Sequence, residues 1–179
     1  MKMTLTQGLL GGLLLMAATQ AQASLTFDGL SAGDIVTGQT IEGVTLSVEN
    51  QGNTGGQPRE LMIFDGTCGG SINNCSGQDQ DLYEPQFGNL LIISEDNDAT
   101  DPDDSAFGGD IYLTFAAQPL DNIVVVDADD GGQNLSWVAA FLNGVQVLAP
   151  QFVNTVDGGF EIIDLGGVTA DLLWVHLDG

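Results

Sequence analysis

The chain has 179 residues, 25 aspartates and glutamates but only two lysines and arginines, and a formal net charge of −23 at pH 7. A surface this negative is repelled by nucleic acid phosphate and by anionic lipid, so nucleic acid is excluded as a partner. The length is that of a single domain that can bury a hydrophobic core.

The N-terminal residues have the features of a cleavable signal peptide. Lys2 forms a positive n-region, Leu9–Ala18 is apolar, and a small-x-small cleavage site ends at Ala23. The apolar stretch is too short to span a bilayer. We expect residues 1–23 to be removed, leaving residues 24–179 as one exported domain without a transmembrane segment, either secreted, on the cell surface or in the periplasm.

Short runs rich in Val, Ile, Leu and Phe alternate with Gly, Asn, Asp and Thr, which indicates an all-β sandwich or barrel. In the first half, these runs predict strands at Leu25–Phe27, Thr40–Glu49 and Glu60–Phe64. A long irregular loop at 67–86 follows, and a further strand is expected at Asn89–Ser94.

The two cysteines of the chain, Cys68 and Cys75, lie in the long loop. An exported protein meets an oxidising compartment, so we expect them to form a disulfide. In the chain-entropy model, such a small ring stabilises the native state by about 2–3 kcal/mol.

The stretch Glu95–Asp110 is the most acidic part of the chain, with carboxylates at seven of its sixteen positions. Neighbouring carboxylates repel each other by about 1 kcal/mol per pair in water and by more when they are desolvated. A Ca²⁺ ion removes that repulsion and uses carboxylate oxygens as ligands. We expect the loop to fold around calcium, with a solvated acidic loop as the alternative.

The second half predicts strands at Ile111–Phe115 and at Asn122–Asp127. The latter is nearly all apolar, which is typical of a central strand buried on both faces. The acidic run Asp127–Gly132 after it partly resembles a calcium loop. It fails the EF-hand pattern, because no helix flanks it and Val138 occupies the twelfth position.

The clearest local prediction is a hairpin. Asn143-Gly144 between Ser136–Leu142 and Val145–Leu148 is typical of a type I′ turn. The last predicted strands are Phe160–Asp164 and Asp171–Leu177.

Several segments resemble a family of secreted bacterial jelly-roll domains, found in extracellular proteins that carry an exosortase-read Pro-Glu-Pro-type sorting signal. The segments are LTFDGLSAGDIVTGQTIEGVTLSVE at Leu25–Glu49, IFDG at Ile63–Gly66, DQDL at Asp79–Leu82, GNLLII at Gly88–Ile93, ED at Glu95–Asp96, the DD and GG pairs within Asp103–Gly109, and the hairpin WVAAFLNGVQVL.

This resemblance implies a galactose-binding-like antiparallel sandwich of jelly-roll type, in which structural calcium and glycan binding both occur. The family continues past the last strand with a closing strand, and some members then carry the sorting signal. We therefore expect this chain either to be a fragment or to be a version without the closing strand and the anchor.

The candidate calcium ligands are acids at one strand end and in the two long loops around GNLLII: Asp65, Asp79, Asp81, Glu95, Asp96, Asp103 and Asp104. Calcium takes six to eight oxygens, so two or three of these acids suffice for one ion. We expect three or four of the seven to be ligands, and the others to cap turns.

The aromatic residues divide into two groups. Trp137 and Trp174 lie in strands beside apolar residues, which favours core packing over a sugar-stacking role. Tyr83 and Phe87 lie in a loop, where exposure is easier, and are the better candidates for contacting a glycan.

An enzyme is not expected. Without the signal peptide the chain has no Lys, one Arg (Arg59) and one His (His176), which removes most nucleophile–base pairs and phosphoryl clamps. We expect a non-catalytic, calcium-stabilised extracellular module that binds glycan or has a structural role in a matrix. The alternative is a small secreted hydrolase of carbohydrates that uses paired carboxylates.

Overall fold

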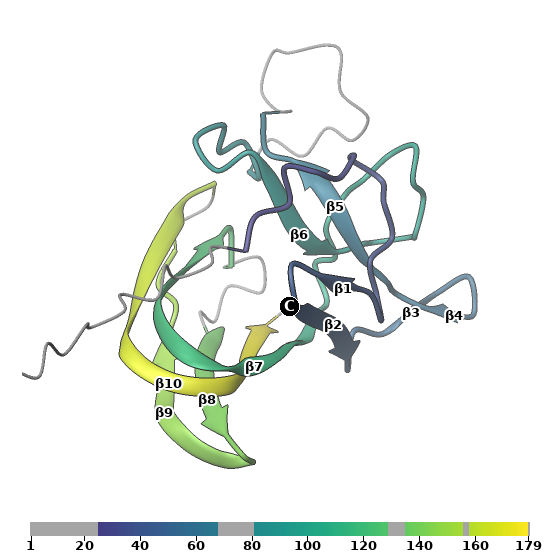
Figure 1. The fold of residues 1–179 in the computed structure, drawn as a ribbon. Coiled ribbons are helices and arrows are strands. Elements are labelled where there is room, and N and C mark those ends of the chain that lie inside the picture. The colour runs from purple at the N-terminus through teal and green to yellow at the C-terminus, as the bar shows by residue number, and fades with distance from the viewer. Residues whose placement is uncertain (1–24, 68–80, 129–134, 156–157, 179) are drawn as a thin grey trace, which may run out of the picture.

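The structure is a computed structural model that describes residues 25–67, 81–128, 135–155 and 158–178 (Figure 1). Its described residues form strands and no helix, so the all-β prediction is confirmed. The strands are β1 (Thr40–Ile41), β2 (Val44–Glu49), β3 (Asn53–Thr54), β4 (Gln57–Pro58), β5 (Leu61–Asp65), β6 (Asn89–Ile93), β7 (Gly108–Val126), β8 (Trp137–Leu142), β9 (Val145–Phe152) and β10 (Phe160–Asp178).

Three predictions lie outside the described residues: the signal peptide, the Cys68–Cys75 disulfide and the ligand role of Asp79. No segment in the described part of the chain forms a helix of the length and apolarity needed to cross a membrane.

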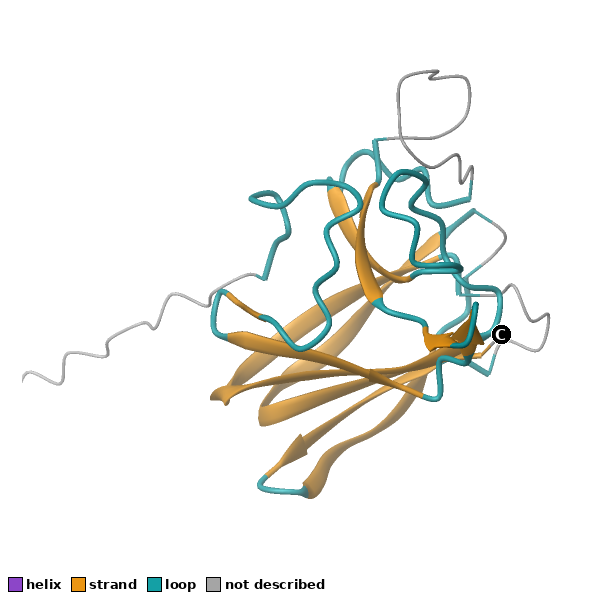
Figure 2. Ribbon diagram, turned by 90° about the vertical axis from the view of Figure 1, so that its right-hand side faces the viewer, coloured by secondary structure: helices purple, strands orange, loops and turns teal. Residues whose placement is uncertain are grey.

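A six-stranded antiparallel sheet in the order β1-β2-β7-β10-β8-β9 forms the larger layer. The β5–β6 pair forms a second, smaller layer, and β3–β4 is a short hairpin. Figure 2 shows that β5–β6 and the long connecting loops lie on one side of the large sheet. We call that side the inner face and the opposite side the outer face.

The hydrophobic core lies between the inner face and β5. Leu46, Ile111 and Val175 of the large sheet pack there with Leu61 and Ile63, all with 6% or less of their surface exposed. Alternate residues of a strand point to opposite faces, so a strand with one buried face contributes every second residue to this core. Each such side chain stabilises the fold by about 1.5–3 kcal/mol.

Two strands are much longer than predicted. β7 contains both Ile111–Phe115 and most of Asn122–Asp127, and it pairs with β10 from Val126↔Phe160 to Gly108↔Asp178. The pair Gly166-Gly167, which separates the two last predicted strands, lies in a register irregularity inside β10, with φ values of 67° and 68°. A bulge of this kind bends a strand without ending it.

Two other predictions are wrong. Leu25–Phe27 does not form a strand, although Leu25 and Phe27 pack against the core. Asn122–Val126 is not buried on both faces, since only Val125 of the five residues is fully buried. It is not a central strand either, because this part of β7 pairs with β10 alone. The predicted hairpin is confirmed: Asn143 and Gly144 connect β8 to β9 with φ values of 50° and 75°.

Candidate functional site

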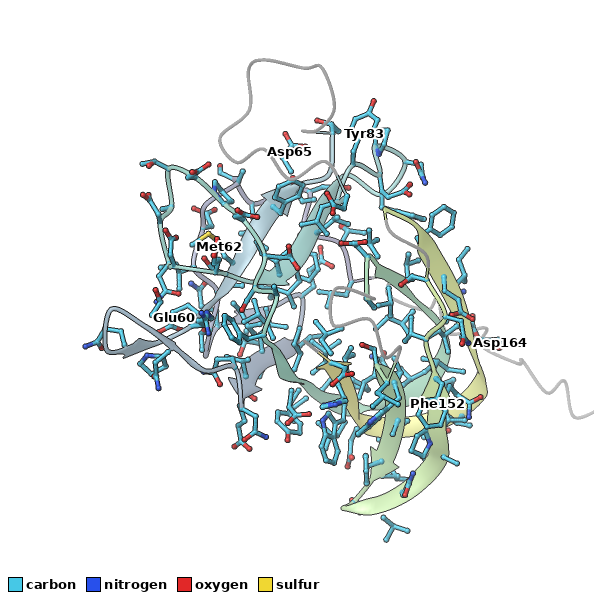
Figure 3. The ribbon with its side chains drawn as sticks, turned by 180° about the vertical axis from the view of Figure 1, so that it is seen from behind. Glu60, Met62, Asp65, Tyr83, Phe152 and Asp164 are labelled. Carbon is cyan, nitrogen blue, oxygen red and sulfur yellow. The ribbon has the colours of Figure 1, made fainter. Side chains whose placement is uncertain are left out.

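The predicted metal ligands lie at one end of β5 and in the loop after β6. Asp65 ends β5, and its Oδ1 accepts hydrogen bonds from the backbone N of Thr67 at 2.9 Å and from its Oγ1 at 2.7 Å. Asp81 is half-buried and directly follows the segment 68–80. In Figure 3, Asp65 and Tyr83 both lie at the top of the molecule, far from Phe152 on the large sheet.

The acidic loop folds back on itself. The backbone N of Glu95 donates to the carbonyl oxygen of Asp103 at 3.0 Å, and Ser94 forms a β-bridge with Asp104. The structure therefore brings the four predicted ligands of this loop to its base, because Asp96 follows Glu95 directly.

Some carboxylates of the loop cap turns. Oδ1 of Asp96 accepts a hydrogen bond from the backbone N of Asp98 at 2.8 Å. Oδ1 of Asp98 accepts bonds from the hydroxyl and the backbone N of Thr100, and these two bonds lower the pKa of Asp98. These acids stabilise the turns of the loop without a metal ion.

A small cavity of about 20 Å³ lies between the acidic loop and the ends of β7 and β10. Its lining includes Asp104, Asp127 and Asp178. Asp127 is buried, and its Oδ1 accepts a hydrogen bond from the backbone N of Gly158 at 2.8 Å. In the described residues, however, no group of three or more Asp, Glu, His or Cys is arranged to hold a metal ion. The described residues alone therefore do not complete a calcium site.

The strongest constellation of polar and aromatic groups lies on the outer face, away from the predicted site. Strand pairing places Glu49, Asp110, His176 and Trp137 in one row across β2, β7, β10 and β8. A second row holds Ser47, Tyr112, Trp174 and Ala139, and a third holds Thr45, Thr114, Leu172 and Phe141. We call these three rows the aromatic face.

Trp174 is the centre of the aromatic face. Its ring centroid lies 4.8 Å from that of Trp137, 5.4 Å from that of Tyr112 and 6.1 Å from that of Phe141. His176 stacks on Trp137 with a centroid distance of 5.3 Å. All five rings are half-buried, so they pack against one another and still reach the surface.

The prediction that Trp137 and Trp174 pack in the core is therefore wrong. Their strand neighbours Val138 and Val175 are the ones that enter the core, and the tryptophans point to the opposite face of the sheet. The alternation of polar and apolar residues in Asp110–Thr114 and Leu173–Leu177 is the signal that could have indicated this.

The carboxylate of Asp110 fixes the orientation of the Trp174 and His176 rings. Its side chain is 6% exposed, and its Oδ1 accepts hydrogen bonds from Nε1 of Trp174 at 2.8 Å and from Nδ1 of His176 at 2.8 Å. Asn50 donates to the other carboxylate oxygen. An ionised carboxylate only accepts hydrogen bonds, so Nδ1 of His176 carries a proton and the ring orientation is fixed.

The electrostatics of this network keep Asp110 ionised. Burial raises the pKa of Asp110, but hydrogen bonds from Asn50, Trp174 and His176, together with the charge of His176, outweigh it and lower the pKa below its ordinary value. Burial and the charges of Asp110 and Glu49 raise the pKa of Tyr112. At neutral pH, Tyr112 therefore keeps its hydroxyl proton as a hydrogen-bond donor.

The two aromatic residues predicted to contact glycan are not part of this face. Tyr83 is 39% exposed. Phe87 packs edge-on against Phe160 with a centroid distance of 5.0 Å and lines a cleft between β6 and β7. Neither residue lies in the three rows of the aromatic face.

The chain matches no protein-family model, no curated protein and no solved structure.

Proposed function

We propose that this chain is a non-catalytic extracellular binding module, an antiparallel sandwich of jelly-roll type that recognises neutral polysaccharide through its aromatic face. The observation that carries the proposal is the half-buried Trp174 ring, which contacts three other aromatic rings and is oriented by a buried carboxylate. A sugar ring has a face of C–H groups that packs on aromatic rings and a rim of hydroxyls that needs polar partners.

The residues around Trp174 include both a hydrogen-bond donor and a hydrogen-bond acceptor for sugar hydroxyls. The hydroxyl of Tyr112 donates, while the exposed carboxylate of Glu49 accepts. The hydrogen bonds that Trp174 and His176 donate to Asp110 hold both rings in place before a ligand arrives, which reduces the entropy lost on binding. The net charge of −23 disfavours polyanionic glycans, so a neutral glycan is the proposed ligand.

Binding is favoured over hydrolysis by the burial and the hydrogen bonds of Asp110. Glu49 and Asp110 are direct partners on adjacent strands, as a carboxylate pair of a glycosidase could be. A hydrolase needs one of its two carboxyl groups to be protonated at neutral pH as a general acid. The lowered pKa of Asp110 is the opposite of what the general acid needs. Its side chain is only 6% exposed and accepts three hydrogen bonds, so it is also poorly placed to reach a sugar or an attacking water as the second carboxylate.

Calcium stays part of the proposal as a stabilising ion of the acidic loop. Its support is the density of acids in the sequence of that loop, together with the backbone hydrogen bond that brings Glu95 and Asp103 side by side. Calcium would reduce their mutual repulsion. The proposed function is tested by measuring retention of the protein and its Trp174→Ala variant on neutral polysaccharides in affinity gels, together with an assay for released reducing sugar.

A further inference from the structure

A cleft of about 840 Å³ lies between β6 and β7, on the inner side of the large sheet. Every residue of Asn89–Ile93 and every residue of Gln118–Asp127 lines it. Successive side chains of a strand point to opposite faces, so a cleft lined by consecutive residues must run along the edges of the two strands.

Both edges lack a partner strand in the part of the chain that the structure describes. β6 has β5 as its partner strand, and its second edge is open along Asn89–Ile92, whereas its Ile93 end is bonded to Ser105. β7 pairs with β2 only through Asp110–Thr114, which leaves the same edge open along Leu120–Val126. An open strand edge presents backbone groups that can pair with another chain.

The hydrogen-bond pattern shows which backbone groups point into the cleft. The backbone N of Ser105 donates to the carbonyl oxygen of Ile93 on the side away from β5, so the backbone of Leu91, two residues earlier, also points away from β5. The backbone N of Asp127 donates to Gly159 on the β10 side. By the same alternation, the N–H and C=O of Val124 point to the open edge.

The chemistry of the cleft is apolar inside and acidic at its rim. Leu91, Leu113, Phe115 and Ile123 are partly buried hydrophobic residues of its wall. Its lining also includes Asp28, Glu42 and Asp121, and no Lys, Arg or His of the described residues lines it. An apolar strand flanked by positive charges is complementary to such a cleft.

We propose that this cleft accepts one extended segment of a partner protein, with alternating apolar side chains and lysine or arginine at its flanks, by strand addition to β6 and β7. Main-chain hydrogen bonds to the two edges supply affinity, and the apolar walls select every second side chain. The overlap with β6 limits the segment to about five to seven residues, or roughly 17–23 Å. A second copy of this chain is disfavoured, because it carries the same large negative charge.

The first experiment uses three fluorescent peptides and the purified protein. The probe is Lys-Val-Thr-Val-Thr-Val-Lys with blocked ends, and the two controls replace either both lysines with glutamate or the central valine with proline. We expect fluorescence anisotropy to show saturable binding of the probe, with binding at least tenfold weaker for each control. Equal binding of all three peptides, or no binding of the probe at 1 mM, would overturn the proposal.

Two further measurements separate a peptide site from a site for a small apolar ligand. Hydrogen exchange of the Leu91 and Val124 amides should slow when the probe is bound, because both N–H groups then have partners. Dodecanoate should leave these two amides unprotected. Protection by dodecanoate equal to that by the probe would assign the cleft to a small apolar molecule and contradict the proposal.

A matched pair of variants tests the backbone contact. Val124→Thr keeps the amide and the strand preference, whereas Val124→Pro removes the N–H that points into the cleft and keeps every hydrogen bond to β10. We expect Val124→Thr to bind the probe within threefold of the unchanged protein and Val124→Pro to bind at least tenfold more weakly. Equal affinities would contradict the proposal, and the hydrogen-exchange result stands independently of whether the proline variant folds.

Discussion

Oδ1 of Asp110 accepts hydrogen bonds from both Trp174 and His176, at 2.8 Å each, although Asp110 lies 64 residues before the first and 66 before the second. One buried oxygen thus orients two of the five rings of the aromatic face. The stability of the sheet and the geometry of the proposed binding surface therefore depend on the same carboxylate.

Asp110→Ala should destabilise the protein strongly. It leaves the donors of the half-buried Trp174 and His176 and of Asn50 without their acceptor, and the loss of an acceptor costs up to about 1–3 kcal/mol for each donor kept from water. We expect the free energy of unfolding to fall by about 3–5 kcal/mol, and by about 1–3 kcal/mol for Asp110→Asn, which keeps one acceptor oxygen. Urea denaturation measures both. An alanine variant within 1 kcal/mol of the unchanged protein would show that the network is not important for stability.

The contribution of Asp110 should also depend on pH. Its pKa in the folded protein is lowered, so its stabilising effect is fully present above the unfolded pKa of about 3.9 and is lost as the pH falls through the folded pKa. The difference in unfolding free energy between the unchanged protein and Asp110→Asn should be large above about pH 4 and shrink below it. Urea denaturation of both proteins at several pH values tests this, and a difference that persists unchanged at about pH 2.5 contradicts it.

Gly33 packs closely against Ala99 of the acidic loop. It has a φ of +87°, and an added Cβ would lie 2.1 Å from the carbonyl oxygen of Ala99. Gly38 is the matched control, because it has a φ of +75° but nothing within 4 Å of an added Cβ. Gly38→Ala should cost about 1–3 kcal/mol from backbone strain alone. Gly33→Ala should cost clearly more in urea denaturation, and equal losses would contradict the contact with Ala99.

Calcium should raise the melting temperature if it binds the acidic loop. A ligand at one hundred times its Kd stabilises the native state by about 2.7 kcal/mol, which is roughly 5–10 °C for a chain of this size. Replacing Asp103 and Asp104 with Asn should remove the shift, while the control Asp121→Asn should keep it. Thermal unfolding in EDTA, in millimolar calcium and in sodium of equal ionic strength measures this. No calcium-specific shift would leave the acidic loop as a solvated surface.

Local sequence patterns predict the turns and the buried positions of single strands, because these depend on a few neighbouring residues. The Asn143-Gly144 turn requires two positive φ values, and the alternation in Val44–Glu49 places Leu46 in the core. The long ladder between β7 and β10 could not be predicted, because Gly166-Gly167 reads as the end of a strand although it forms a bulge inside one.

The aromatic face could not be predicted either, because its residues come from strands that are distant in the sequence. Asp110 was interpreted as the last carboxylate of the acidic loop, whereas it is the third residue of β7. Its partners Trp174 and His176 come close only through the pairing of β7 with β10, and no spacing in the sequence encodes that pairing. The acidic loop itself was predicted correctly in its position between two strands, because charge density is a local property.

We propose that the aromatic face binds neutral glycan without cleaving it. The most direct test is a glycan array probed with the unchanged protein, Trp174→Ala and Tyr83→Ala, followed by a reducing-sugar assay on each glycan bound. We expect the unchanged protein and Tyr83→Ala to bind neutral glycans, Trp174→Ala to lose this binding, and no sugar to be released. Loss of binding in Tyr83→Ala alone, or release of sugar by the unchanged protein, would contradict it.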